Sequence, residues 1–176
     1  MKPKIIGAML LFTISYFTMS SQETPHFSDK SIQKSVIVNC SLDATWWKWT
    51  THEGLKTFFG ENNNIELVPG GPYEIYFSML APKGQKGGEG CTVLSYIPKR
   101  MLSFTWNAPP SFPDIRKAEE YTWVVVEFEA LSERQTLVKL THLGWREGKD
   151  WDGVYKYFEA SWDTVMGWLR KSCEGE

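Results

Sequence analysis

His142 is the titratable residue whose position most suggests chemistry. It ends an alternating run in which Val138, Leu140 and His142 share one face, and that face is predicted to point inward. An imidazole at the end of an apolar face could exchange protons with a ligand or hydrogen-bond a ligand carbonyl. The blander and more frequent alternative is a histidine satisfied by a backbone group near the sheet edge.

Hydroxyl and acidic side chains add candidates but no second catalytic group of defined geometry. Four tyrosines could orient the polar end of an apolar ligand, namely Tyr73, Tyr96, Tyr121 and Tyr157. Glu119 and Glu120 are adjacent, and adjacent strand residues point to opposite faces, so they do not form an acid–base pair. The one candidate proton-transfer set is therefore His142 with a tyrosine.

The sequence lacks the residue patterns needed for binding a metal, a phosphate group or a nucleic acid. His26, His52 and His142 lie far apart, with no carboxylate at ligand spacing, so no metal site is predicted. Residues 84–90 are glycine-rich but lack the lysine–hydroxyl order of a phosphate loop and open no helix. The net charge of -2, with both signs interspersed, gives no basic surface for nucleic acid. We expect no metal, no cofactor and no nucleic-acid partner.

The three cysteines, Cys40, Cys91 and Cys173, are too few and too scattered for a stapled scaffold or a zinc site. One of them must stay unpaired within a monomer. A Cys40–Cys91 bridge is one alternative if the protein is exported, but sequence cannot place the two α-carbons within bonding range.

A long amphipathic helix is predicted near the C-terminus, over residues 151–169. Its apolar positions recur at three- and four-residue intervals: Val154, Phe158, Trp162, Val165 and Leu169. Asp150 or Asp152 is expected to cap its start. A helix with such a face needs a large apolar surface to lie against, and the chain before it is mostly strand. We therefore expect a sheet beneath it.

The preceding chain alternates in the manner of antiparallel strands. Residues 31–40 form a first strand, and two short helices follow, capped by Ser41 or Asp43 and by Thr51. Further strands are expected at 65–68, 73–79, 91–97, 102–106, 121–130 and 136–144. Residues 107–119 hold three prolines and are predicted to be an irregular loop that covers a site. This order predicts an α+β fold with one sheet curving around one helix.

The N-terminal residues have the pattern of a secretory signal. Residues 1–21 begin with two lysines, continue as an apolar run and end in small polar residues. Residues 22–30 are interpreted as a flexible lead-in, and residues 31–172 as the folded domain. We expect an exported protein, periplasmic or secreted, with no stable membrane anchor after cleavage. The alternative is a protein tethered through an uncleaved N-terminal segment.

Several local motifs, in their order, resemble a known family. They are Trp47-Lys48-Trp49-Thr50-Thr51, Glu53-Gly54-Leu55, Pro69-Gly70-Gly71-Pro72-Tyr73, Gly90 ahead of a strand ending in Pro98, Arg100-Met101-Leu102-Ser103-Phe104-Thr105-Trp106, Thr136 to His142, and Trp162. The chain is similar to the START/Bet v 1-like (SRPBCC) superfamily and, within it, to the family related to the activator of Hsp90 ATPase. It departs from that family at Thr51-His52, where an acidic residue is usual, and at Phe58, where tryptophan is frequent.

The resemblance implies a helix-grip fold, in which a curved antiparallel sheet wraps the C-terminal helix around an apolar cavity. The residues expected to line it are Tyr73, Ile75, Phe77, Phe104, Trp106, Val138, Leu140, His142, Phe158 and Trp162. The first hypothesis is a carrier or sensor of a hydrophobic small molecule or lipid. The second is a cyclase- or hydratase-type enzyme that uses His142 and a tyrosine. The third is a co-chaperone-like interaction module, with no protein partner identified.

Overall fold

The computed structural model describes residues 27–174. The predicted signal segment, 1–21, and most of the predicted lead-in lie outside the described residues. At the described start of the chain, Phe27 forms an isolated antiparallel bridge with Arg146, and the Ser28 amide donates to the Trp145 carbonyl at 2.7 Å. Within residues 27–174, no helix combines the length and the apolar character needed to cross a bilayer.

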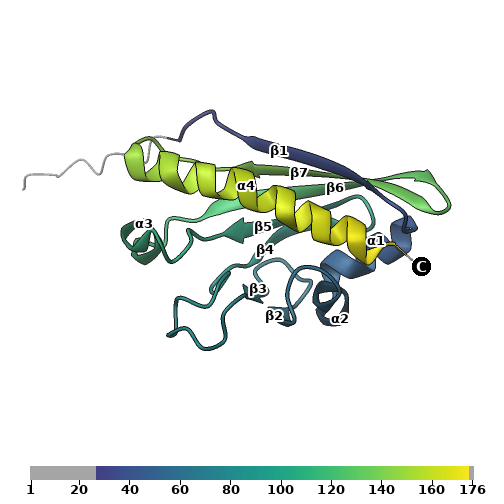
Figure 1. Ribbon diagram of the computed structural model, residues 1–176, viewed down its shortest axis with the longest axis horizontal. Helices are drawn as coiled ribbons and strands as arrows, with labels where there is room; N and C mark the ends of the chain where they lie inside the picture. Colours follow the sequence, from purple (N-terminus) through teal and green to yellow (C-terminus); the bar gives the residue numbers. More distant parts are fainter. Residues whose placement is uncertain (1–26, 175–176) are drawn as a thin grey trace, which may run out of the picture.

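Strands and helices follow one another in the order expected for an α+β domain. They are β1 (Ile32–Val38), α1 (Leu42–Thr50), α2 (His52–Lys56), β2 (Asn62–Ile65), β3 (Tyr73–Tyr76), β4 (Val93–Ile97), β5 (Met101–Trp106), α3 (Pro113–Lys117), β6 (Thr122–Ser132), β7 (Gln135–Leu143) and α4 (Lys149–Ser172). Figure 1 shows α4 lying across the sheet, with α1 and α2 near its C-terminal end. The predicted α+β fold, with two short helices after the first strand, is confirmed.

The main sheet has five antiparallel strands in the order β1-β7-β6-β5-β4, and β2 and β3 form a separate pair. Alternation decides which side chains reach the core, because successive strand residues point to opposite faces. On β6, Val124 and Val126 are fully buried, whereas Glu127 and Glu129, which follow them on the opposite face, are exposed. The buried face meets α4, so the sheet and the helix enclose one core.

Two of the three predicted helix caps are correct. The Ser41 side chain accepts from the Ala44 amide at the start of α1, and Thr51 accepts from the Gly54 amide at the start of α2. The expected cap of α4 by Asp150 or Asp152 is wrong, since Gly148 precedes the helix at φ 121° without a side-chain cap. That positive φ suits glycine. Both aspartates instead lie in the first turn, where the helix dipole favours negative charge.

The cysteine pairing also differs from the alternative that sequence left open. Cys40 is joined to Cys173, with an α-carbon separation of 5.4 Å, and Cys91 is a buried free thiol. A Cys40–Cys91 bridge is therefore wrong. The two bridged residues are 133 positions apart, and only the docking of α4 brings its C-terminal end to the junction of β1 and α1. Burial raises the pKa of the Cys91 thiol to about 12, so it stays protonated at neutral pH.

Candidate functional site

The space between the sheet and the middle of α4 is filled by side chains that satisfy one another. The Trp162 indole Nε1–H donates to His142 Nδ1 at 2.9 Å. An indole nitrogen can only donate, so Nδ1 accepts and the imidazole proton sits on Nε2. Nε2–H then donates to Thr122 Oγ1 at 2.7 Å, and the threonine hydroxyl donates to the Trp106 carbonyl at 2.8 Å. Each donor in this series has one acceptor.

This arrangement gives His142 a structural role. The side chain is fully buried, and burial lowers its pKa well below the usual value of 6.5, so the ring stays neutral at neutral pH. Both ring nitrogens are occupied, and the rings of Trp145 and Phe158 pack against it at centroid distances of 4.3 and 5.1 Å. Among the four candidate tyrosines, Tyr73 donates to the Trp49 carbonyl within the core. Within residues 27–174, the ring nitrogens of His142 bond to Trp162 and Thr122 rather than to a tyrosine, and a catalytic role for His142 stays a prediction.

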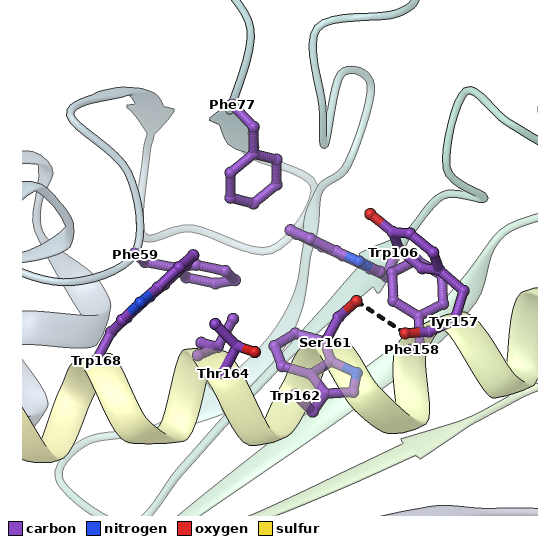
Figure 2. A pocket seen from close by; sticks show the side chains of 10 residues that line it. Phe59, Phe77, Trp106, Tyr157, Phe158, Ser161, Trp162, Thr164 and Trp168 are labelled. Atoms are coloured by element: carbon purple, nitrogen blue, oxygen red, sulfur yellow. Dashed lines mark hydrogen bonds between the residues drawn. The ribbon is translucent and has the colours of Figure 1, made fainter.

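A hollow of about 190 Å³ lies beside this packed interior, between α4 and the segments that follow α2 and β3. Its lining residues carry no ionised group; they are Phe59, Phe77, Trp106, Tyr157, Phe158, Ser161, Thr164, Trp162, Val165 and Trp168. Figure 2 shows the rings of Phe77 and Phe59 facing the helix, with Trp168 beside Phe59 and Tyr157 toward the other end. The hollow is open to solvent at its mouth.

The helix supplies most of this lining because its apolar face is wider than the sheet can cover. Phe158, Trp162 and Val165 point into the core, whereas Tyr157 and Trp168 lie beside that buried face and remain accessible. The floor is aromatic: Phe59 stacks on Trp106 with ring centroids 5.7 Å apart, and its centroid is 5.9 Å from that of Trp162.

Arg116 holds the wall opposite α4 in place. This wall is the loop of residues 77–90, which begins with Phe77. The guanidinium of Arg116 donates to the Gly87 carbonyl at 2.7 Å and also to the carbonyls of Gly84 and Ala108. Two of these carbonyls lie in the loop and the third lies between β5 and α3, so one rigid fork of donors ties the loop to that segment. The position of Phe77 at the mouth of the hollow therefore depends on an arginine from α3.

The lining of the hollow includes hydroxyl groups. Ser161 Oγ donates to the Tyr157 carbonyl at 2.8 Å, one turn earlier in α4. Tyr157 and Thr164 add two further hydroxyls to the lining. Within residues 27–174, no cluster of three histidine, cysteine, aspartate or glutamate side chains is placed to hold a metal ion. The hollow can therefore take up an uncharged, apolar group and offer it weak hydrogen bonds.

The structure brings only some of the predicted ligand-binding residues to this hollow. Phe77, Trp106, Phe158 and Trp162 line it. The others are buried in the core and do not; they are Tyr73, Ile75, Phe104, Val138, Leu140 and His142. Contact of the four with a ligand stays a prediction. Sequence reasoning missed Phe59 and Trp168, although an aromatic residue just beside the apolar face of a helix is a usable signal.

Solved structures share this fold at low sequence identity. A structural-genomics protein from Mesorhizobium loti superposes with a TM-score of 0.64 and 17% identity, over 81% of this chain and 96% of that one. The Aha1 dimer from Colwellia psychrerythraea gives a TM-score of 0.60 and 20% identity, over 83% and 97%. A protein from Bacillus halodurans gives a TM-score of 0.60 and 20% identity, over 82% and 97%. These similarities establish the fold alone.

Sequence comparison assigns the family. No protein of curated function matches the chain significantly. The profile described as "Activator of Hsp90 ATPase homolog 1-like protein" matches residues 39–172, which run from the residue after β1 to the end of α4. Because the match covers most of the chain and the fold agrees, this protein belongs to the Activator of Hsp90 ATPase homolog 1-like family, within the SRPBCC/Bet v 1-like fold.

Proposed function

We propose that this protein binds a hydrophobic small molecule, or the apolar chain of a lipid, in the hollow between α4 and the loop of residues 77–90. The observation that carries the proposal is a set of large rings held around an uncharged hollow while exposed to water. The Phe77 side chain is 54% exposed and that of Trp168 is 44% exposed. Fully burying a side chain of this size is worth about 1.5–3 kcal/mol, so an apolar occupant would recover part of that free energy.

The size of the hollow limits the ligand. Ligand pockets typically enclose about 300–1,000 Å³, and this hollow encloses about 190 Å³. Trp106 and Trp162 pack together at a centroid distance of 5.7 Å and close off the deeper space under α4. The ligand is therefore small, or only its apolar part is enclosed while the remainder stays at the surface.

We also propose that the protein folds in an oxidising compartment, as a periplasmic or secreted protein. Stable disulfides are characteristic of such compartments and rare in the cytosol. The Cys40–Cys173 bridge is buried and links the two ends of the domain. It agrees with the secretory pattern of residues 1–21, which rests on sequence alone.

The binding proposal is tested with a neutral fluorescent probe, N-phenyl-1-naphthylamine, on protein lacking residues 1–21. We expect saturable binding of the probe that weakens by about tenfold in Trp168→Ala, because the probe loses its contact with the exposed part of the Trp168 indole. Ser161→Phe should also weaken binding, since its ring enters the hollow. Trp47→Ala is the matched control, because Trp47 is 43% exposed but does not line the hollow.

The comparison with the control decides the result. Equal probe binding in the wild type and in Ser161→Phe, with both proteins folded by circular dichroism, would contradict the proposal. So would a loss of binding in Trp47→Ala equal to that in Trp168→Ala. Mass spectrometry of material extracted from the purified protein then identifies any natural ligand.

A further inference from the structure

The loop of residues 77–90 presents three large apolar side chains to water within four positions. Phe77 is 54% exposed, Met79 is 48% exposed and Leu80 is 100% exposed. Single exposed apolar residues are ordinary on protein surfaces, but a cluster at a loop tip marks a contact surface. The loop follows β3 and extends away from the body at the lower left of Figure 1. We call Phe77, Met79 and Leu80 the apolar tip.

The loop is ordered, which makes the exposure of its tip informative. Besides the Arg116 contacts, the Phe77 and Ser78 amides both donate to the Lys86 carbonyl, at 2.8 and 3.0 Å. The Glu89 carboxylate accepts from the Gly84 and Lys86 amides. A mobile segment could turn apolar side chains inward, but this bonded loop holds them in water. The fold therefore maintains an unfavourable exposure that an interaction partner would relieve.

The charges on the loop indicate the kind of partner. Lys83 and Lys86 follow the apolar tip in the same loop, and no ion pair engages either amine within the described part of the chain. The single acidic residue of the loop, Glu89, is turned toward loop amides and lies 3.6 Å from Arg116. Apolar side chains that enter the acyl region, beside lysines that meet lipid headgroups, are the pattern of an interfacial membrane contact.

We infer that the apolar tip and its two lysines dock this protein on an anionic lipid bilayer. Phe77 belongs both to the tip and to the lining of the hollow, so docking would bring the mouth of the hollow to the bilayer surface. The inference stands on the loop alone, and it holds whatever the hollow binds.

The test is co-sedimentation of protein lacking residues 1–21 with vesicles of phosphatidylcholine, with or without phosphatidylglycerol. The wild type should partition onto the anionic vesicles more strongly than onto the neutral ones. Removing each lysine charge should weaken that partitioning by about fivefold, so the double variant Lys83→Gln and Lys86→Gln loses most of the difference. Raising the salt concentration should also weaken partitioning onto the anionic vesicles.

The apolar contribution is tested by the double variant Met79→Ser and Leu80→Ser, which should lose at least about tenfold in partitioning. Both side chains are exposed, so folding should be unaffected. Leu131→Ser is the matched control, because Leu131 is 45% exposed near the end of β6 and does not belong to the loop of residues 77–90. N-phenyl-1-naphthylamine binding should persist in the double variant, which separates docking from binding in the hollow.

Three outcomes would overturn the inference. The first is a wild type that ignores anionic vesicles, and the second is a tip variant that partitions as the wild type does. The third is concentration-dependent dimerisation that disappears in the tip variant while no vesicle binding is seen, because the tip would then be a contact between two copies.

Discussion

Two tryptophans on α4 have opposite environments. Trp162 is 1% exposed and donates to His142, whereas Trp168 is 44% exposed at the edge of the hollow. A helix turns by about 100° per residue, so side chains six positions apart point about 120° away from each other. The sheet covers the side of α4 on which Trp162 lies. Trp168 points toward the loop of residues 77–90, and the hollow lies between that loop and α4.

This difference separates stability from binding within one helix. The side of α4 that faces the sheet is here called the closed side. On it, every polar atom in the series from Trp162 to the Trp106 carbonyl has a partner, so no ligand is needed to complete the series. On the side of α4 that faces the hollow, here called the open side, the rings of Phe77 and Trp168 remain about half exposed to water. Substitutions on the closed side should therefore change the free energy of unfolding, and those on the open side should mainly change ligand binding.

The largest effect is expected from Trp162→Ala compared with Trp168→Ala. Removing a buried aromatic side chain typically costs about 3–5 kcal/mol of unfolding free energy, and here it also strands His142 Nδ1. Trp168→Ala should cost about 1 kcal/mol or less, because much of its surface is already solvated. Urea unfolding followed by circular dichroism measures both. Similar losses in the two variants would remove the distinction between the sides.

The second largest loss of unfolding free energy is expected on removal of the disulfide, which anchors the end of α4 that carries Trp168. The double variant Cys40→Ala and Cys173→Ala should lose about 2–4 kcal/mol, as expected for a bridge that closes a long loop. Reductant should destabilise the wild type and Cys91→Ala equally, since Cys91 is outside the bridge. Peptide mapping that finds Cys91 in a disulfide would contradict the pairing.

The stability of the closed side should depend on pH through His142. Its pKa is lowered in the folded state, so between the unfolded value of 6.5 and the folded value only the unfolded chain binds the proton. Stability is therefore complete above about pH 6.5 and falls as the pH is lowered, by at most about 1.4 kcal/mol per pH unit.

His142→Gln is the control for this pH dependence, because an amide can accept from Trp162 without titrating. The slope of stability against pH between 5 and 6.5 should be smaller in that variant than in the wild type. Probe binding in the hollow should change little over the same range, because no ionised side chain lines it. An unchanged slope in His142→Gln would refute the assignment to this residue.

The smallest effect is expected from Arg116→Lys, which acts on the far wall of the open side. A lysine keeps the charge but cannot reach three carbonyls at once. Global stability should fall by about 1 kcal/mol, whereas amide exchange at Phe77 and Gly88 should accelerate and probe binding weaken. Lys117→Met on the same helix is the control. Unchanged exchange in Arg116→Lys would show that the loop holds its own conformation.

Local chemistry was predictable where neighbouring residues decide it. Ser41 and Thr51 cap their helices because a side-chain oxygen two or three positions before an amide can reach it in any context. The prediction of the α4 cap failed because Asp150 and Asp152 both carry the sequence signal of a capping residue, and neither one is the residue that precedes the helix. Gly148 precedes α4 instead, with a positive φ that the aspartates would not readily adopt.

The candidate site was predictable only in part. The apolar periodicity of α4 identified Phe158 and Trp162, and strand alternation identified Phe77 and Trp106. The same alternation also selected Val138 and Leu140, which the core covers. Periodicity reports which face turns inward, but it does not report whether another side chain fills the space in front of it.

By itself, the sequence determined the amphipathic helix, the alternating strands and the family resemblance, because these depend on residues near one another in the chain. Only the tertiary structure decided the Cys40–Cys173 pairing, the closed series around His142 and the hollow beside Trp168. Each of these depends on segments far apart in sequence, brought together when α4 packs on the sheet. No local pattern encodes such a distance, because many packings bury the same apolar face.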